Sequence, residues 1–232
     1  MKIHRFYTEQ QLSLGDNILT DEQLLRHLGV VRIKDNELIV LFNEDGFEYI
    51  ATLKKQGKEY TATISDKKEN ECEPKKEVHL FLAILKNEHT EYALEKATEL
   101  GIKSFTPLIT ERTIKTNINY ERLTKIATHA AEQSGRAHVP VIHLACTLEE
   151  ALSKQDKHTR ILFCDIGEIH NTPSKQSTAN QSCTVFVGPE GGWSDDERLL
   201  AREFDAEYIS LGTTVLRGET AAIIGTYYAL QK

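Results

Sequence analysis

The segment TVFVGPEGGWSDDE, residues 184–197, contains in order an apolar run, a glycine-rich turn and the start of a helix. Its first residues, TVFVG (184–188), have the nearly continuous apolar character of a strand buried on both faces of a parallel sheet. Ser194 and Glu197 have the spacing of a capping box and predict that a helix begins there. A buried strand that leads through a short turn into a helix is the repeating unit of an α/β fold.

The same alternation of strand and helix fills the chain on both sides of this segment. VHLFLAIL (78–85) and ILFCDI (161–166) are further buried strands, and weaker strands are expected at 104–109 and 208–211. Helices are expected at 91–100, 120–134, 194–204 and 219–230, with a short one after the capping box of Thr147 and Glu150. This pattern predicts an α/β domain with a mostly parallel sheet.

The first part of the chain has a different pattern. Short runs rich in β-branched and aromatic residues occur at 37–43, 47–53 and 59–65, joined by hairpin-sized turns, and one helix is expected at 20–28. Several short antiparallel strands predict a small β-barrel. The segment KKENECEPKKE (67–77) is highly charged and contains a proline, which is typical of a linker. We therefore expect one domain over residues 1–70 and a second over 71–232.

The composition excludes several classes of protein. With 40% apolar and 27% charged residues the chain is neither disordered nor collagen-like. No apolar run approaches the roughly 18 residues of a membrane helix, and the N-terminus lacks a signal-peptide core, so we expect a cytoplasmic protein. The cysteines have no C-x-x-C spacing and the histidines no pair at metal-ligand spacing, so neither a disulfide framework nor a metal is expected. The net charge of −7 argues against non-specific coating of nucleic acid but allows a local basic patch.

Two loops after predicted strands are candidates for a ligand site, because open α/β sheets bind ligands beyond the carboxyl ends of their strands. Residues 188–194 place three glycines around Glu190, where bare backbone can approach a ligand closely. This loop is neither a G-x-G-x-x-G fingerprint nor a Walker loop, and a plain glycine-rich turn is an equal alternative on spacing alone. Residues 211–222 place Arg217 and Glu219 at the mouth of the last helix.

Together these segments resemble a known family. GPEGGWSDDE (188–197), followed by ISLGTTVLRGETAA (209–222), is similar to the signature pair of the RsmE family of 16S ribosomal RNA uridine N3-methyltransferases, which belongs to the SPOUT class. The resemblance covers nearly the whole chain, through KATELGIKSFTPLITERT (96–113) and AAEQSGRAHVP (130–140) to a PUA-like start at HLGVVRIKDNELIVLF (27–42). One departure is Thr214, where family members commonly carry an arginine, so one cationic group expected at the cofactor loop is missing.

The resemblance implies a fold, a cofactor and partners. The C-terminal domain would be a SPOUT-type parallel sheet with a deep trefoil knot, and the N-terminal one a PUA-like β-barrel that binds RNA. S-adenosylmethionine (SAM) would bind between three loops, two of them those above and the third after the strand that ends near Cys164. The implied cofactor-binding residues are Cys164, Gly188, Pro189, Glu190, Gly191, Gly192, Leu211, Gly212, Val215, Leu216 and Arg217. The implied partners are the 16S rRNA of the small ribosomal subunit and a second copy of the chain.

The chemistry of the reaction assigns further expected roles. Loss of the imide proton from uridine N3 spreads negative charge over two ring carbonyls, and Arg217 is the expected donor to them. Glu190 and Glu219 are candidate general bases, but either can be a cofactor or structural ligand, and solvent can also take the proton. Trp193 is expected to pack in the core. Contacts with RNA are expected from Arg5, Arg26, Arg32, Lys86, Arg112 and Arg136.

Two other functions stay open at this point. Other SPOUT enzymes methylate a ribose 2′-oxygen, and product analysis separates the two reactions because a 2′-O-methyl group blocks alkaline cleavage of RNA. A non-catalytic ribosome-binding factor could use the same fold; the intact glycine loop and Arg217 argue against this alternative, while Thr214 keeps it open. An apolar stripe through Ala221, Ile224 and Tyr228 predicts that the last helix is buried in a dimer.

Overall fold

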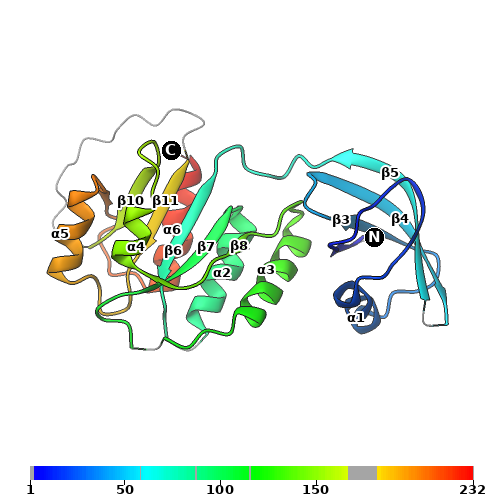
Figure 1. Cartoon of the computed structure of the whole chain (residues 1–232), viewed down its shortest axis with the longest axis horizontal. Coiled ribbons are helices and arrows are strands. Elements are labelled where there is room, and N and C mark those ends of the chain that lie inside the picture. Colours follow the sequence, from blue (N-terminus) through cyan, green and yellow to red (C-terminus); the bar gives the residue numbers. More distant parts are fainter. Residues whose placement is uncertain (1–2, 58, 87, 115, 167–181, 232) are drawn as a thin grey trace. The chain divides into compact units, whose positions relative to one another are not determined.

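The computed structural model describes residues 3–57, 59–86, 88–114, 116–166 and 182–231 (Figure 1). Contacts within the chain divide it into two compact units, which we call the N-terminal unit (Met1–Glu73 with Thr128–Val139) and the C-terminal unit (Pro74–Ala127 with Pro140–Lys232). The segment Thr128–Val139 groups with the N-terminal unit through contacts such as the ion pair of Arg136 with Glu73.

The C-terminal unit contains a parallel sheet with the strand order β12-β10-β11-β6-β7-β8, and β9 pairs with β7. Every recorded pair in it is parallel, which confirms the predicted α/β fold with a parallel sheet. The strands are β6 (Val78–Ala83), β7 (Ser104–Ile109), β8 (Val141–Ile142), β9 (Cys146–Thr147), β10 (Arg160–Cys164), β11 (Cys183–Val187) and β12 (Glu207–Ile209).

Helices alternate with these strands close to the predicted positions. They are α2 (His89–Leu100), α3 (Tyr120–Ser134), α4 (Leu148–Ser153), α5 (Asp195–Glu203) and α6 (Gly218–Gln231), and α3 from Thr128 onward belongs to the N-terminal unit. The capping boxes at Thr147 and Ser194 are both present, which confirms the two predicted helix starts. Gly101 ends α2 with a φ of 107°, a left-handed conformation that glycine adopts without steric cost. None of the described helices combines the length and apolar character of a membrane span.

The central strands of this sheet are buried on both faces, as their apolar runs predict. On one face α6 packs against β11, β6 and β10. A Cβ at Gly225 would lie 3.0 Å from the sulfur of Cys164 and 3.1 Å from Val185, so glycine permits the close approach of α6. The other face forms an aromatic cluster in which Phe163 stacks on Trp193 with ring centroids 4.3 Å apart. Trp193 is therefore a core residue, as expected.

The N-terminal unit is built on a five-stranded sheet with the order β1-β3-β4-β5-β2. Its elements are β1 (His4–Tyr7), β2 (Gly15–Ile18), α1 (Glu22–Val31), β3 (Glu37–Phe42), β4 (Phe47–Gln56) and β5 (Glu59–Glu69). Its pairs are antiparallel except β1 with β3, and closure into a barrel stays a prediction. The expected linker 67–77 is strand up to Glu69, because its first residues continue the hairpin with β4. All four cysteines are free in this structure.

Candidate functional site

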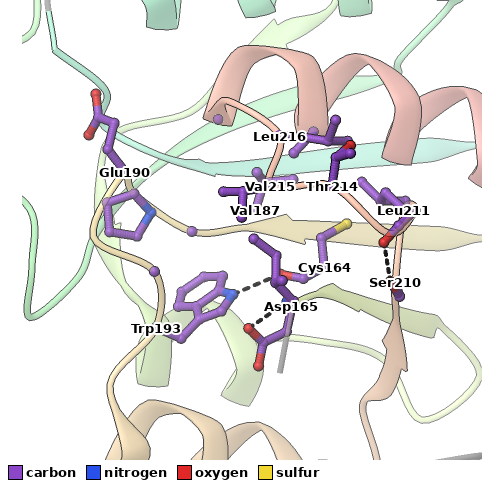
Figure 2. A pocket seen from close by; sticks show the side chains of 17 residues that line it. Cys164, Asp165, Val187, Glu190, Trp193, Ser210, Leu211, Thr214, Val215 and Leu216 are labelled. Carbon is purple, nitrogen blue, oxygen red and sulfur yellow. Dashed lines mark hydrogen bonds between the residues drawn. The ribbon is translucent and has the colours of Figure 1, made fainter. Parts of the chain in front are cut away.

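Three neighbouring strands of the C-terminal sheet end at a common pocket. The order β12-β10-β11 is parallel throughout, so the loops that follow these strands meet at one edge of the sheet (Figure 2). The pocket there is lined by Cys164, Asp165, Ile166, Val187, Gly188, Pro189, Glu190, Gly192, Trp193, Ser210, Leu211, Gly212, Thr214, Val215, Leu216, Gly218 and Ala221. The structure therefore brings together the two loops that the sequence singles out and the first residues after β10, where the resemblance implies the third loop. Residues 167–181, the greater part of the third loop, lie outside the described residues.

The glycine-rich loop after β11 is held in shape by Trp193. A Cβ at Gly188 would lie 2.9 Å from the indole ring, so only glycine fits there. The indole Nε1 donates a hydrogen bond of 2.9 Å to the backbone oxygen of Cys164, which ties this loop to the end of β10 (Figure 2). Gly192 has a φ of 69° and donates its N–H to the oxygen of Pro189 at 2.8 Å, which closes the turn. Trp193 and the Gly192–Pro189 hydrogen bond thus fix the shape of the loop.

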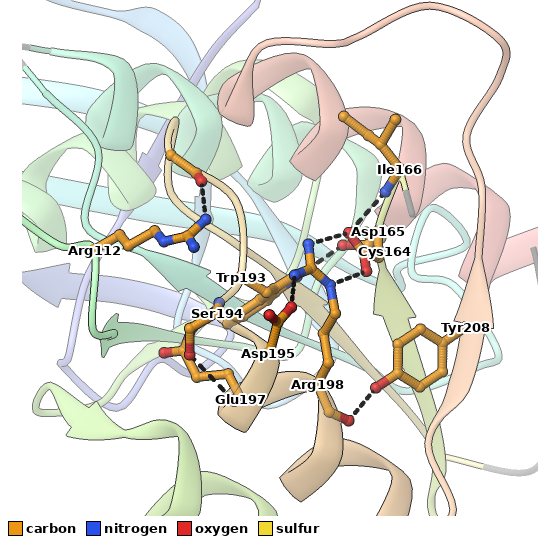
Figure 3. Close-up of polar contacts among 11 residues, drawn as sticks. Arg112, Cys164, Asp165, Ile166, Trp193, Ser194, Asp195, Glu197, Arg198 and Tyr208 are labelled. Atoms are coloured by element: carbon orange, nitrogen blue, oxygen red, sulfur yellow. Dashed lines mark hydrogen bonds and ion pairs between the residues drawn. The ribbon is translucent and has the colours of Figure 1, made fainter. Parts of the chain in front are cut away.

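Two further loops of the same unit support this turn. The backbone N–H of Lys86, which follows β6, donates to Oε1 of Glu190 at 2.8 Å. Arg112, which follows β7, donates from Nη1 to the backbone oxygen of Gly191 at 2.7 Å (Figure 3). A Cβ at Gly191 would come within 3.3 Å of the Arg112 side chain. Glu190 and Arg112 therefore both brace the glycine-rich loop.

An ion pair that the sequence does not predict joins the end of β10 to α5. Arg198 donates from Nε to Oδ2 of Asp165 at 2.7 Å and contacts Asp195 at 3.2 Å (Figure 3). Asp165 also accepts the N–H of Ile166 at 2.8 Å, and the Tyr208 hydroxyl donates to the backbone oxygen of Arg198. The one available sequence signal was that Asp165 directly follows a buried strand, where ligand-binding loops begin.

The loop after β12 carries the remaining predicted residues. Thr214 lines the pocket, and Arg217 is exposed and lies between two lining residues, although it is not among the described lining residues itself. Glu219 is buried in the first turn of α6, where its Oε1 lies 3.2 Å from Nδ1 of His89. The carboxylate of Glu219 is thereby paired with α2.

Cys164 forms an apolar part of the pocket wall. Its side chain is buried at the end of β10, next to Gly225 of α6. Burial raises the pKa of the Cys164 thiol to about 12, because a thiolate would be poorly solvated there. The thiol is consequently neutral near pH 7 and does not act as a nucleophile.

The structure separates the six expected RNA contacts into two groups. Arg136 is buried and forms an ion pair with Glu73 at 3.0 Å. Its side chain is therefore not available to RNA, and the expected RNA contact of Arg136 is corrected. Arg5 is half-buried, pairs with Glu48 and donates to the backbone oxygen of Arg136 at 2.9 Å. Both guanidinium groups thus stabilise the N-terminal unit. The exposed members of the set are Arg26, Arg32, Lys86 and Arg112.

Comparison with known proteins gives the family of the chain. A family model described as an RNA methyltransferase domain matches residues 71–229. The ribosomal RNA small subunit methyltransferase E of Rickettsia conorii is 34% identical over 229 residues, which cover 96% of this chain and 93% of the relative. The chain belongs to the RsmE family. This confirms the resemblance drawn from the two signature segments.

Other members of the RsmE family are similar over equally long stretches. The Bacillus subtilis relative is 28% identical, and the alignment covers 93% of this chain and 90% of the relative. A crystal structure of the family member from Neisseria gonorrhoeae, bound to S-adenosyl methionine, has a TM-score of 0.91 and 30% identity. That alignment covers 99% of this chain and 98% of the other, so the similarity extends over nearly the full length of both chains.

Proposed function

We propose that this RsmE-family chain transfers a methyl group from SAM to N3 of a uridine in the 16S rRNA of the small ribosomal subunit. Family membership makes it a SAM-dependent rRNA methyltransferase. The observation that supports the proposal most is the pocket where β10, β11 and β12 end, in a chain whose Neisseria relative binds SAM over the same fold. The choice of N3 of uridine rests on the signature pair in the sequence.

The residues of the pocket fit this cofactor in charge and shape. Among the described lining residues the charged side chains are Glu190 and Asp165, which is paired with Arg198, and the absence of a cation among them suits a sulfonium. Gly192 and Gly212 line the pocket with positive φ values of 69° and 142°, and a Cβ at either would meet no atom within 4 Å. Their bare backbone therefore borders open space, as a site for a closely held ligand requires. We propose that the three loops hold SAM between them.

The chain's own residues have to position the uridine and stabilise its charge. When bound, SAM supplies a methyl group that its sulfonium already activates, so orientation of the acceptor is the main requirement. Arg217 is exposed beside the lining residues Leu216 and Gly218, and it is available to a base at the pocket mouth. Its planar guanidinium can donate to carbonyl oxygens as N3 loses its proton.

We propose that Glu190 and Glu219 hold the loops around the pocket in position and that solvent takes the proton from uridine N3. One oxygen of Glu190 accepts the Lys86 N–H, and Glu219 is buried against His89. A base needs an oxygen directed at the proton that it removes. The bonds of both carboxylates serve instead to fix the loops around the pocket.

For RNA binding we propose the exposed cations Arg26, Arg32, Lys86 and Arg112. The net charge of −7 requires such contacts to be local, because the chain as a whole repels phosphates. Arg112 would then both contact RNA and support the glycine-rich loop, since it donates a hydrogen bond to the Gly191 carbonyl.

The deep trefoil knot and the homodimer are also part of the proposal. Two large apolar side chains of α6, Ile224 and Tyr227, are 38% and 55% exposed, and a second copy of the chain would cover them. The C-terminal strand order, in which β10 and β11 lie between β12 and β6, is compatible with a chain that passes through its own loop.

The test is a methylation assay followed by nucleoside analysis. The purified chain is incubated with SAM and with small ribosomal subunits from a strain that lacks the gene, and the RNA is digested to nucleosides. We expect N3-methyluridine in amounts that follow the number of subunits. A 2′-O-methylated nucleoside would replace the proposal by the ribose reaction, and SAM binding without any transfer would leave a non-catalytic factor.

A further inference from the structure

We infer that His27, His129 and Glu132 form a binding site for one divalent transition-metal ion of the zinc type. All three residues belong to the N-terminal unit. Each offers one ligand atom, and these atoms lie within 4.8 Å of one another. Two imidazoles with one carboxylate are a ligand set that suits zinc and its neighbours better than magnesium or calcium, which prefer oxygen ligands alone.

The helices arrange the three side chains for this purpose. His129 and Glu132 are three residues apart on α3, so they share one helix face, and α1 contributes His27. Nδ1 of His27 lies 3.4 Å from Oε1 of Glu132. Neighbouring ligand atoms of a tetrahedral zinc site with bonds of about 2.0–2.2 Å are about 3.3–3.6 Å apart. The centroids of the His27 and His129 rings lie 4.9 Å apart. Because His129 is exposed, its ring can turn and bring its ligand nitrogen closer to the ligand atoms of His27 and Glu132.

Surrounding groups hold two of the ligands in place. Glu132 is only 8% exposed, and its Oε1 accepts the backbone N–H of Tyr7 at 3.0 Å. The ring of Phe6 meets the His27 ring edge-on, with centroids 5.1 Å apart. Ligands oriented in this way lose little freedom on metal binding. The exposed side of His129 leaves a fourth position to water, and the ion would join α1 to the end of α3.

The spacing of the histidines in the sequence gives no sign of this cluster. His27 and His129 are far apart along the chain and meet only in the folded unit. The simpler alternative is a protonated His27 in an ion pair with Glu132, with His129 as a surface residue. A metal ion competes with that proton, so metal binding should strengthen toward mildly alkaline pH.

The test uses the untagged full-length chain, treated with a chelator and dialysed, in calorimetric titrations with zinc chloride and, for comparison, magnesium chloride. We expect one zinc ion per chain, no comparable magnesium binding, and a zinc-dependent rise in the melting temperature. His129→Ala should weaken zinc binding by about 10–100-fold or more, the loss known even for residues that only support a ligand. Because His129 is exposed, this variant is expected to fold.

His158→Ala is the matched control, since His158 is an exposed histidine outside the cluster. It should bind zinc like the unaltered chain. Circular dichroism of each variant without metal verifies the fold. Absence of zinc binding to the unaltered chain, or equal affinities of the two variants, would overturn the inference and leave the cluster as an ion pair.

Discussion

At the scale of single residues, Gly188 shows how one absent side chain shapes the site. We predict that Gly188→Ala lowers cofactor affinity and reduces the free energy of unfolding by about 1–3 kcal/mol, because the added methyl group would overlap the Trp193 indole. Gly29→Ala is the control, since a Cβ there meets nothing within 4 Å. Calorimetry with SAM and thermal denaturation measure both effects. Equal behaviour of the two variants would show that the indole does not constrain position 188.

Glu190 is the residue whose expected role changes most. We predict that Glu190→Gln keeps turnover within a few-fold of the unaltered enzyme, because an amide oxygen can still accept the Lys86 N–H. Glu190→Ala should weaken SAM binding by about 1 kcal/mol, the typical worth of one hydrogen bond. Steady-state kinetics with both variants are the measurement. A glutamine variant that binds SAM normally but does not turn over would identify Glu190 as the general base.

Arg217 is the proposed donor to the uracil ring. We predict that Arg217→Lys reduces turnover by about 10²–10³-fold while SAM affinity changes little, because a lysine cannot present a planar fork to two oxygens. Single-turnover methylation with saturating RNA and SAM measures this directly. If the single-turnover rate of the variant were normal and only the half-saturating concentrations of RNA and SAM rose, Arg217 would be a binding residue.

At the scale of elements, the ion pair between Asp165 and Arg198 connects β10 to α5. We predict that Arg198→Met lowers the free energy of unfolding by about 1–3 kcal/mol and weakens SAM binding, because the largely buried Asp165 carboxylate in the pocket wall loses its ion-pair partner. Arg122→Met is the control, since its pair with Glu91 is exposed and should contribute about 0–1 kcal/mol. Urea denaturation that gave both variants the same stability would count against this role.

Strands and helices around the site can be predicted where a short stretch of sequence marks them. The apolar runs mark β6, β10 and β11, and the capping boxes at Thr147 and Ser194 mark two helix starts. The short strands β1, β2, β8 and β9 escape prediction, because two to four residues carry no usable period. The contacts of Glu190, Arg112 and Asp165 escape as well, since they depend on the order of strands in the sheet.

At the scale of the whole molecule, we predict a homodimer that buries α6. Light scattering should give a particle of twice 26.3 kDa, and charges introduced by Ile224→Glu with Tyr227→Glu should yield monomers. Val30→Glu is the control, because Val30 is a large apolar residue on α1 that is 79% exposed. A monomer at micromolar concentration for the unaltered chain would contradict the dimer.

We propose that the pocket at the ends of β10, β11 and β12 directs a methyl group to N3 of one uridine in 16S rRNA. The most direct measurement is mass spectrometry of 16S rRNA fragments from a strain without the gene, complemented either by the unaltered chain or by Arg217→Lys. We expect one uridine that lacks its base methyl group in the deletion strain, regains it with the unaltered chain and regains little of it with the variant. A deletion strain in which no uridine loses a base methyl group, or in which the missing methyl group belongs to a ribose, would contradict the proposal.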